Sequence, residues 1–453
     1  MKSIKFTEAL INSDNLVERY YNLLLSSEEL FSSTIKNGFS GYPNTFDPDF
    51  KIPALDEKLI SFLEPTKASI VSIGKYKGRE ISLFNLMKNP ETNTVKTFAA
   101  TLLIARAVSH IREKHEKIIV FSPSSGNKAI ALRDAVLRAI KCDLVSPEEL
   151  RIITLTPKDT KEKLRVSELS SDKYLKNLNP AFVLDTDSPE KVKDIGNKFK
   201  ERFNDKNKSH TKLWHSLKLE NYRFADQIRA FYDYEFGELE NNKCVHVHSV
   251  SSAYGFLGYK TGVDRLNDLG CKTQMPAFLL VQHLATSDMV DFLLTGSFES
   301  PKNIYSLSKD GYYHQSNLKN YPFRTSSIKE ILEQTFYSHK PATVHEMTDI
   351  INTYGGNGVV VSLLECLERY ALIREMLCNA GVSLVADAKN VKEWSLIMAL
   401  TGAMNAIDRN LIREDMSNFV IHGTGYYSSC DYESLGPDDY ISVMNEVQMM
   451  NYI

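Results

Sequence analysis

The chain has 453 residues, of which 43% are hydrophobic and 25% are charged, and its formal net charge is −3. This composition is that of an ordinary globular protein and excludes a disordered, collagen-like or coiled-coil chain. The length exceeds what one hydrophobic core usually supports, so two or three domains are expected. The balance of 54 Lys and Arg against 57 Asp and Glu provides no net positive field for nucleic acid or an anionic membrane.

No apolar run reaches the roughly 18 residues that a membrane-spanning helix needs. The first five residues do not begin a secretory signal. The six cysteines are scattered, without a C-x-x-C pair or a zinc-like Cys/His spacing. We therefore expect a cytoplasmic protein with reduced cysteines, and neither nucleic acid nor membrane as a partner.

Short β-branched runs alternate with amphipathic stretches, which predicts an α/β fold of open, mostly parallel sheets with helices on both faces. In chain order, strands are expected at residues 117–121, 151–155, 181–185, 245–250, 277–282 and 419–422. Helices are expected at residues 98–108, 128–139 and 256–269. The very polar stretch 200–212 indicates a loop or a crossing between domains. Lysine-rich stretches such as 158–163 fit solvated faces better than a nucleic-acid surface.

The first segment with chemical potential is a polar turn that begins at Asn89-Pro90 and delivers Lys96 to the first turn of an apolar helix. A helix N-terminus disfavours a cation by about 0.3–1 kcal/mol. Burial beside apolar residues also lowers the pKa of a lysine, and both effects favour the neutral amine that forms imines. A solvated lysine near a helix start is the alternative interpretation.

Three further turns of small polar residues follow predicted strands: Ser124, Ser125, Gly126 and Asn127; Ser249, Ser251, Ser252 and Ala253; and His422 with Thr424. Hydroxyl and amide groups at a strand-to-helix turn can bind an anion. Open α/β sheets also place ligand groups at the carboxyl ends of their strands. Taken singly, each turn is equally compatible with a helix cap or a tight turn.

In this order and spacing, the four segments resemble the fold-type II enzymes that use pyridoxal phosphate, and most closely the threonine synthases. Asn89-Pro90 and Lys96 are similar to the family's N-P-T-G-S-F-K segment, and the turn at 124–127 is similar to its S/T-S/T-G-N turn. The resemblance covers residues 50–430. It implies a larger cofactor-binding domain made of residues 1–95 and 206–453, a smaller substrate-binding domain of residues 96–205, and a cofactor in the cleft between them.

The resemblance also implies roles for individual residues. Lys96 would be the catalytic residue, linked covalently to pyridoxal phosphate and then acting as a base. The substrate carboxylate would be bound by Ser124, Ser125, Gly126 and Asn127, with Asn127 also contacting the cofactor. The cofactor phosphate would be bound by Ser249, Ser251, Ser252 and Ala253. The pyridine nitrogen would be contacted by His422 or Thr424.

The implied activity is that of a lyase or transferase, which eliminates or replaces a β or γ leaving group on a small α-amino acid. Threonine synthase chemistry on a phosphorylated homoserine and a β-reaction in specialised amino-acid metabolism both stay open. The serine-rich phosphate turn also leaves open a non-catalytic ligand-binding protein. The family resemblance allows a homodimer. No metal is expected: His246 and His248 share one face of a strand and could reach one ion, but core packing explains them better.

Overall fold

The computed structural model describes residues 4–29, 31, 46–124, 126–186, 191–206, 211–215, 219–237, 239, 243–299, 301, 304–336 and 338–453. The chain divides into two compact units, each built around its own sheet. Unit 1 comprises Met1–Phe6, Ala68–Lys88 and Gln227–Asp431, and unit 2 comprises Thr7–Lys67, Asn89–Asp226 and Tyr432–Ile453. Compared with the predicted division, the structure groups residues 7–67, 89–95, 206–226 and 432–453 with unit 2 instead of the larger domain.

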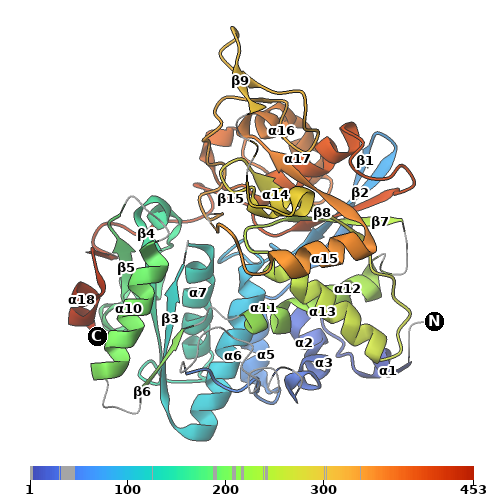
Figure 1. Cartoon of the computed structure of the whole chain (residues 1–453). Helices are drawn as coiled ribbons and strands as arrows, with labels where there is room; N and C mark the ends of the chain where they lie inside the picture. Colours follow the sequence, from blue (N-terminus) through green and yellow to red (C-terminus); the bar gives the residue numbers. More distant parts are fainter. Residues whose placement is uncertain are drawn as a thin grey trace. The chain divides into compact units, whose positions relative to one another are not determined.

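Unit 1 contains a six-stranded sheet in the order β1-β2-β14-β7-β8-β12; β1, β2, β7 and β8 are labelled in Figure 1. Its strands are β1 (Ser69–Tyr76), β2 (Arg79–Asn85), β14 (Asn418–Gly423), β7 (Cys244–Ser249), β8 (Ala277–His283) and β12 (Gly356–Val361). Only the β1–β2 pairing is antiparallel. The central strands are buried on both faces, as expected for a parallel sheet covered by helices.

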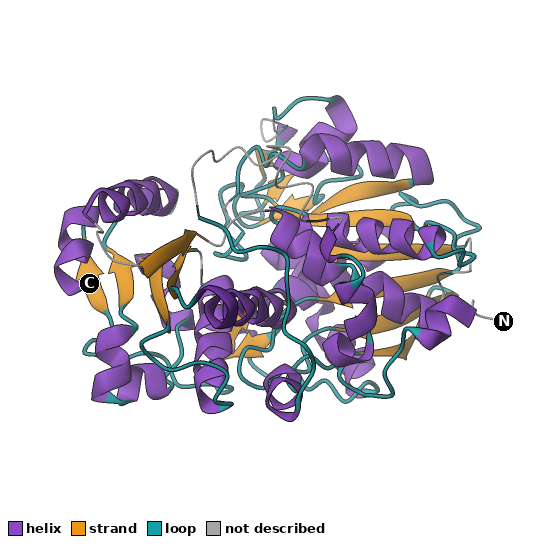
Figure 2. Cartoon of the chain, turned by 90° about the horizontal axis from the view of Figure 1, so that it is seen from below, coloured by secondary structure: helices purple, strands orange, loops and turns teal. Residues whose placement is uncertain are grey.

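Helices cover both faces of this sheet (Figure 2). Alternate residues of the strands, such as Val247 and Leu279, form one core with α16 (Leu363–Cys378) and α17 (Ser395–Asp408). The residues between them face the helices of the other side, where His246 and Phe278 contact the ring of Tyr259. The remaining helices of unit 1 are α12 (Ile228–Phe236), α13 (Tyr254–Asp268), α14 (Asp288–Thr295), α15 (Val344–Tyr354) and the short η3 (Ala388–Asn390). Two small sheets pair β9 (Ser306–Leu307), β10 (Tyr313–His314) and β11 (Arg324–Thr325), and β13 (Val391–Glu393) with β15 (Tyr427–Ser428).

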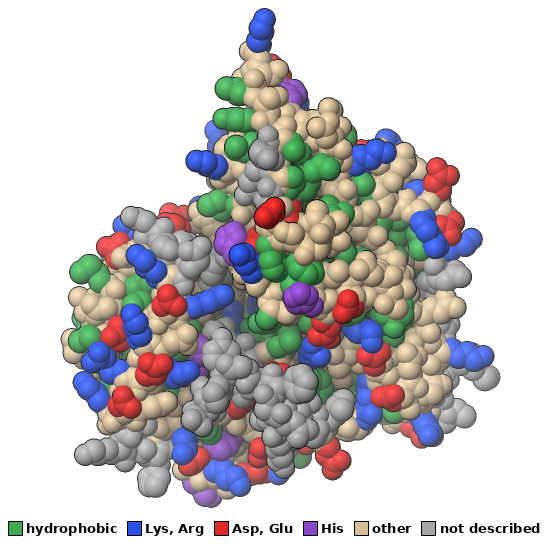
Figure 3. Space-filling model, in the orientation of Figure 1, with side chains coloured by type: hydrophobic (Ala, Val, Ile, Leu, Met, Phe, Trp, Pro, Cys, Tyr) green, Lys and Arg blue, Asp and Glu red, His purple; other side chains and the backbone are tan. Residues whose placement is uncertain are grey.

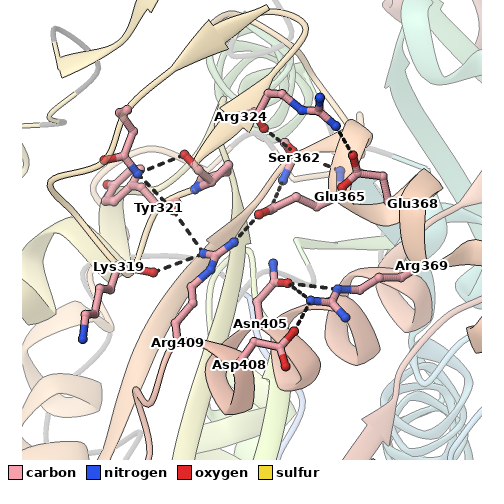
Figure 4. A network of polar contacts seen from close by, with 12 residues as sticks. Lys319, Tyr321, Arg324, Ser362, Glu365, Glu368, Arg369, Asn405, Asp408 and Arg409 are labelled. Carbon is pink, nitrogen blue, oxygen red and sulfur yellow. Dashed lines mark hydrogen bonds and ion pairs between the residues drawn. The ribbon is translucent and has the colours of Figure 1, made fainter.

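A polar network fastens α16 and α17 to their neighbours (Figure 4). Arg369 of α16 donates to the side chains of Asn405 and Asp408 of α17, with a shortest distance of 2.6 Å to the Asp408 carboxylate. Arg409 forms a buried ion pair with Glu365. It also donates to the carbonyl oxygen of Tyr321 at 3.1 Å. These bonds satisfy charged groups that would be costly to bury alone.

Unit 2 contains a parallel five-stranded sheet in the order β16-β5-β4-β3-β6. Its strands are β3 (Lys117–Pro123), β4 (Leu150–Pro157), β5 (Ala181–Leu184), β6 (Thr211–His215) and β16 (Ile441–Val443). On one face, Phe121 and Phe182 form a core with Phe199 of α10 (Lys191–Lys206) and Met449 of α18 (Glu446–Met449). The long helices α6 (Lys96–Lys114) and α7 (Asn127–Lys141) pack against each other and against β3.

Shorter elements complete the chain. They are α1 (Ile4–Glu8), α2 (Leu16–Arg19), α3 (Tyr21–Leu25), α5 (Glu57–Leu63), η1 (Lys158–Lys163), α8 (Glu168–Ser171), α9 (Lys173–Leu178), α11 (Leu219–Asp226) and η4 (Met450–Tyr452). The two-unit α/β architecture with open, mostly parallel sheets confirms the predicted fold class. The six predicted strands and three predicted helices are all present, with ends shifted by a few residues.

The half-buried carboxyl group of Asp134 in α7 makes a prediction about how the stability of the protein depends on pH. Burial raises the pKa of Asp134 to about 6, although Arg138 lies 3.7 Å away. Because this pKa is higher than in the unfolded chain, the folded state binds more protons between about pH 4 and 6, and stability falls as the pH rises through that range. We expect Asp134→Asn to stabilise the protein by up to about 3 kcal/mol at pH 7.5. Denaturant unfolding at pH 4 and pH 7.5 checks this, and an equal effect at both pH values would contradict it.

Candidate active site

The turn before Lys96 is held by hydrogen bonds among its own polar groups. The Asn89 side chain donates to the carbonyl oxygen of Thr94 at 3.1 Å and accepts from its amide at 3.2 Å. Arg165 donates to the carbonyl oxygens of Glu91 at 2.6 Å and Thr92 at 3.1 Å. The hydrogen bonds of Asn89 within the turn and those of Arg165 from outside it hold the backbone in place. The turn therefore sets the position at which α6 begins.

Lys96 is the first residue of α6 and is half-buried. Its Nζ lies 5.4 Å from the centre of the Tyr222 ring, on α11. A second amine, Nζ of Lys128 on α7, lies 5.5 Å from the centre of the same ring. Burial lowers the pKa of Lys128 well below its usual value, and the neighbouring charge of Lys96 lowers it further. Unit 2 thus brings two lysine amines to one aromatic ring.

The second predicted turn lies where β3 ends and α7 begins. The amide of Ser124 donates to the carbonyl oxygen of Leu155 at 2.9 Å, which anchors the turn to β4. Gly126 has a φ of +128°, a conformation that favours glycine. Asn127 starts α7. Ser125, the remaining predicted member of this turn, lies outside the described residues.

The predicted phosphate turn connects β7 to α13 in unit 1. Ser249 is buried, whereas Ser251 and Ser252 are half-buried. Ala253 has a φ of +54°, which is unusual for a residue other than glycine and marks a tightly constrained turn. Thr343 fastens the turn by donating to the carbonyl oxygen of Ser252 at 2.7 Å. The serine hydroxyls and the first amides of α13 form the donor set that a phosphate requires.

A buried arginine lies against this turn. A side-chain carbon at Gly255 would come within 2.6 Å of Nη2 and 2.7 Å of Nη1 of Arg229, so the guanidinium occupies the space that glycine leaves open. Arg229 comes from α12 and is almost completely buried. A guanidinium favours phosphate oxygens because its donors form a planar fork. The cation therefore adds to the fit between this turn and a phosphate group.

The two predicted contacts of the pyridine nitrogen lie in different surroundings. Thr424 is half-buried, and its hydroxyl lies 3.3 Å from the hydroxyl of Ser249. His422 is fully buried within the sheet, and its Nε2 lies 2.9 Å from Nδ1 of His246. Burial lowers the pKa of His422 well below its usual value, so the imidazole is neutral near pH 7. Thr424, and not His422, thus lies beside the phosphate turn.

The predicted site residues fall on both units. Lys96, Ser124, Gly126 and Asn127 belong to unit 2, and the serine turn, His422 and Thr424 belong to unit 1. Three residues that were given no role in the predicted site lie close to its members: Lys128, Tyr222 and Arg229. Lys128 directly follows Asn127, which was predicted to be a site residue. Its position in the sequence was therefore enough to indicate that it lies near the site. No signal in the sequence pointed to Arg229, because α12 is separated from the phosphate turn by a strand and a loop.

A family of unknown function, DUF6002, matches residues 12–453 of the chain. The chain belongs to the DUF6002 family. No curated protein matches it in sequence.

Solved structures show which fold this DUF6002 protein adopts. Threonine synthase from Escherichia coli has a TM-score of 0.54 and 12% identity, covering 93% of this chain and 97% of its own. A PLP-bound threonine synthase from Brucella melitensis has a TM-score of 0.50 and 10% identity, covering 87% and 81%. An L-serine ammonia-lyase from the fungus Rhizomucor miehei has a TM-score of 0.51 and 9% identity, covering 80% and 94%. The fold is that of the threonine synthases, which confirms the structural part of the resemblance.

The surface of the DUF6002 protein agrees with its small net charge. On the face drawn in Figure 3, Lys and Arg side chains are interspersed with Asp and Glu. Among the described residues, none of the helices combines the length and the apolar character needed to cross a bilayer.

Proposed function

We propose that this DUF6002 protein is a pyridoxal phosphate-dependent lyase or transferase, which eliminates or replaces a β or γ leaving group on a small α-amino acid. The observation that carries the proposal is the placement of Lys96, at the start of α6 after a hydrogen-bonded turn, in a chain with the threonine synthase fold. A second line of support is the serine turn with Arg229, whose donors suit a phosphate.

In this proposal the residues of each unit have separate tasks. When bound, pyridoxal phosphate supplies an electron sink for negative charge at the substrate Cα. In unit 1, Ser251, Ser252 and Arg229 bind the phosphate, and the Thr424 hydroxyl bonds the pyridine nitrogen. In unit 2, Lys96 would hold the cofactor through Nζ, and its amine would serve as the base that takes the proton from the substrate Cα.

The substrate is oriented by the turn at the start of α7. Ser124 and Asn127 donate to its carboxylate, which fixes the Cα–H bond toward the Lys96 amine. Departure of the leaving group, such as phosphate, acetate or hydroxide, then gives either an elimination product or a replacement product. Which of these forms depends on the nucleophile that enters, so threonine synthase chemistry is one member of the proposed class.

Mass spectrometry after borohydride reduction tests the proposal. The full-length protein is incubated with pyridoxal phosphate, reduced, digested and searched for a pyridoxyl group on lysine. We expect the group on the peptide that contains Lys96, and a visible absorption band that reduction removes. A pyridoxyl group on Lys88, Lys128 or Lys260 would contradict the assignment of Lys96. No modified lysine would instead favour a non-catalytic ligand-binding protein of the same fold.

The phosphate turn makes a separate prediction. Replacing both Ser251 and Ser252 with alanine removes two hydroxyl donors, each worth about 1.5–3 kcal/mol toward a charged group. We expect the affinity for pyridoxal phosphate to fall about 100-fold or more, while affinity for unphosphorylated pyridoxal changes little. Equilibrium dialysis with both compounds measures this, with Ser429→Ala, an exposed serine of unit 1, as the control. Unchanged retention of pyridoxal phosphate would place the phosphate at another turn.

A further inference from the structure

Three histidines of unit 1 meet inside the sheet. His246 and His248 project from one face of β7, and the parallel register pairs Val420 and Ile421 of β14 with His246 and Val247. His422, the next residue of β14, therefore lies beside His248. Their exposed fractions are 0% for His246, 2% for His248 and 0% for His422. Sequence spacing could not show this cluster, because β14 follows β7 by about 170 residues and becomes its neighbour only through the strand order.

We propose that His246, His248 and His422 bind one divalent transition-metal ion, with zinc as the best match. Each ring offers one nitrogen, and these three nitrogens lie within 4.8 Å of one another. Zn–N bonds of about 2.0–2.1 Å in tetrahedral geometry place ligand nitrogens about 3.3 Å apart. The nitrogens therefore need to approach by at most about 1.5 Å, and this approach includes a turn of one imidazole ring.

The polar atoms of the cluster also point to a ligand. Nε2 of His248 and Nδ1 of His422 are buried and have no hydrogen-bond partner among the described residues. A buried polar nitrogen without a partner is costly, because it has lost its hydrogen bonds with water. A metal ion bound to the imidazoles would restore a partner to Nε2 of His248. Imidazole ligands suit Zn²⁺, Cu²⁺, Ni²⁺ and Co²⁺, and disfavour Mg²⁺ and Ca²⁺.

A buried carboxylate, that of Asp233, lies next to the cluster on the side of His246. Oδ2 of Asp233 lies 3.5 Å from Nε2 of His246 and accepts a 2.6 Å hydrogen bond from the hydroxyl of Tyr259. Metal-binding histidines commonly direct their second nitrogen toward a carboxylate, which fixes the ring and makes it a better ligand. Asp233 also supplies negative charge against the charge of the ion and of nearby Arg229.

Metal binding would rearrange two contacts. The 2.9 Å hydrogen bond between Nδ1 of His246 and Nε2 of His422 occupies two nitrogens with one proton. If both nitrogens bind the ion, the proton between them moves to the other nitrogen of the ring that carries it, so each imidazole stays neutral and no net proton is released. The rings of His248 and His422 are stacked with centres 3.9 Å apart and planes inclined by 28°. One of these rings must turn for both lone pairs to face the ion.

The proposal does not depend on pyridoxal phosphate, so its test uses the metal alone. Full-length protein is treated with a chelator, freed of it, and titrated with Co²⁺ and Zn²⁺. We expect one ion per chain by elemental analysis, an absorption band of tetrahedral Co²⁺ in the visible range, and a higher Tm with Zn²⁺. Absence of stoichiometric binding by the wild-type protein would overturn the proposal.

Variants locate the ion. His248→Phe keeps a ring of similar shape and removes one ligand, so we expect loss of the Co²⁺ band and of the Zn²⁺-induced rise in Tm. His283→Phe is the matched control, since His283 is an equally buried histidine of the neighbouring strand β8 outside the cluster, and it should bind metal as the wild type does. Metal binding retained by His248→Phe would overturn the assignment. If that variant fails to fold, imidazole ¹⁵N shifts of the wild-type protein during Zn²⁺ titration decide, and unchanged shifts refute the site.

Discussion

Lys96→Ala is expected to abolish the visible absorption of lysine-bound cofactor and to lower turnover by at least about 10²–10⁴-fold, the usual worth of proton transfer by a positioned side chain. The substitution removes both the covalent link and the base. It should leave the fold intact, because Lys96 is half-buried at the edge of α6 and the preceding turn is held by Asn89 and Arg165. The expected loss therefore concerns chemistry and not stability.

Absorption spectra and exchange of the Cα proton of candidate amino acids in deuterium oxide measure the two effects of Lys96→Ala separately. Lys260→Ala is the control: this lysine lies on α13 next to the serine turn and is paired with Asp264 at 2.5 Å. It should keep both the absorption band and the exchange. A Lys96→Ala variant that still forms the band would transfer the role to another amine, and Lys128 would be the first to examine.

Arg106→Met is expected to destabilise unit 2 by about 3–5 kcal/mol, the usual effect of removing one partner of a buried ion pair. Arg106 is 1% exposed and forms an ion pair with the buried Asp47 at 3.0 Å. It also hydrogen-bonds Asn221 of α11 and the carbonyl oxygen of Pro48, and its guanidinium lies 3.7 Å from the centre of the Phe50 ring. One side chain of α6 thus fixes both the segment 47–50 and α11.

Denaturant unfolding of both proteins measures the effect of Arg106→Met. Arg112→Met is a matched control on the same helix, because Arg112 is exposed and its loss should change the free energy of unfolding by no more than about 0.5 kcal/mol. Asp47→Asn should also destabilise, since the Arg106 charge stays buried. If Arg106→Met and Arg112→Met cost the same, the buried pair makes no special contribution.

The strands that sequence reasoning identified share one property: they lie inside their sheets. β3, β4, β7 and β8 are buried along almost their whole length, and most of their residues form apolar runs such as Ile118–Phe121. Among the overlooked strands of the two main sheets, β1, β6, β12 and β16 lie at sheet edges, where polar residues and glycine interrupt the pattern. The overlooked β2 lies inside its sheet, but polar residues interrupt its apolar run as well. An edge strand buries less of its surface, so its sequence carries a weaker signal.

The site residues also fall into two groups, those that the sequence could locate and those that it could not. Lys96 and the serine turn could be located because each follows or precedes a recognisable element. Arg229 and the partnership of His246 with His422 could not, because these contacts join residues far apart in the chain through strand order and helix packing. The roles assigned to the individual site residues stay predictions.

The position of β14 has a consequence for biosynthesis. β14 is among the last strands in the chain, yet it lies in the middle of its sheet between β2 and β7. Until residues 418–423 leave the ribosome, β2 and β7 have unpaired edges of the kind that recruits other chains. Unit 1 can therefore close only after residues 418–423 have been translated, and a chain that stalls before Asn418 exposes two aggregation-prone strands to the chaperones that must hold it.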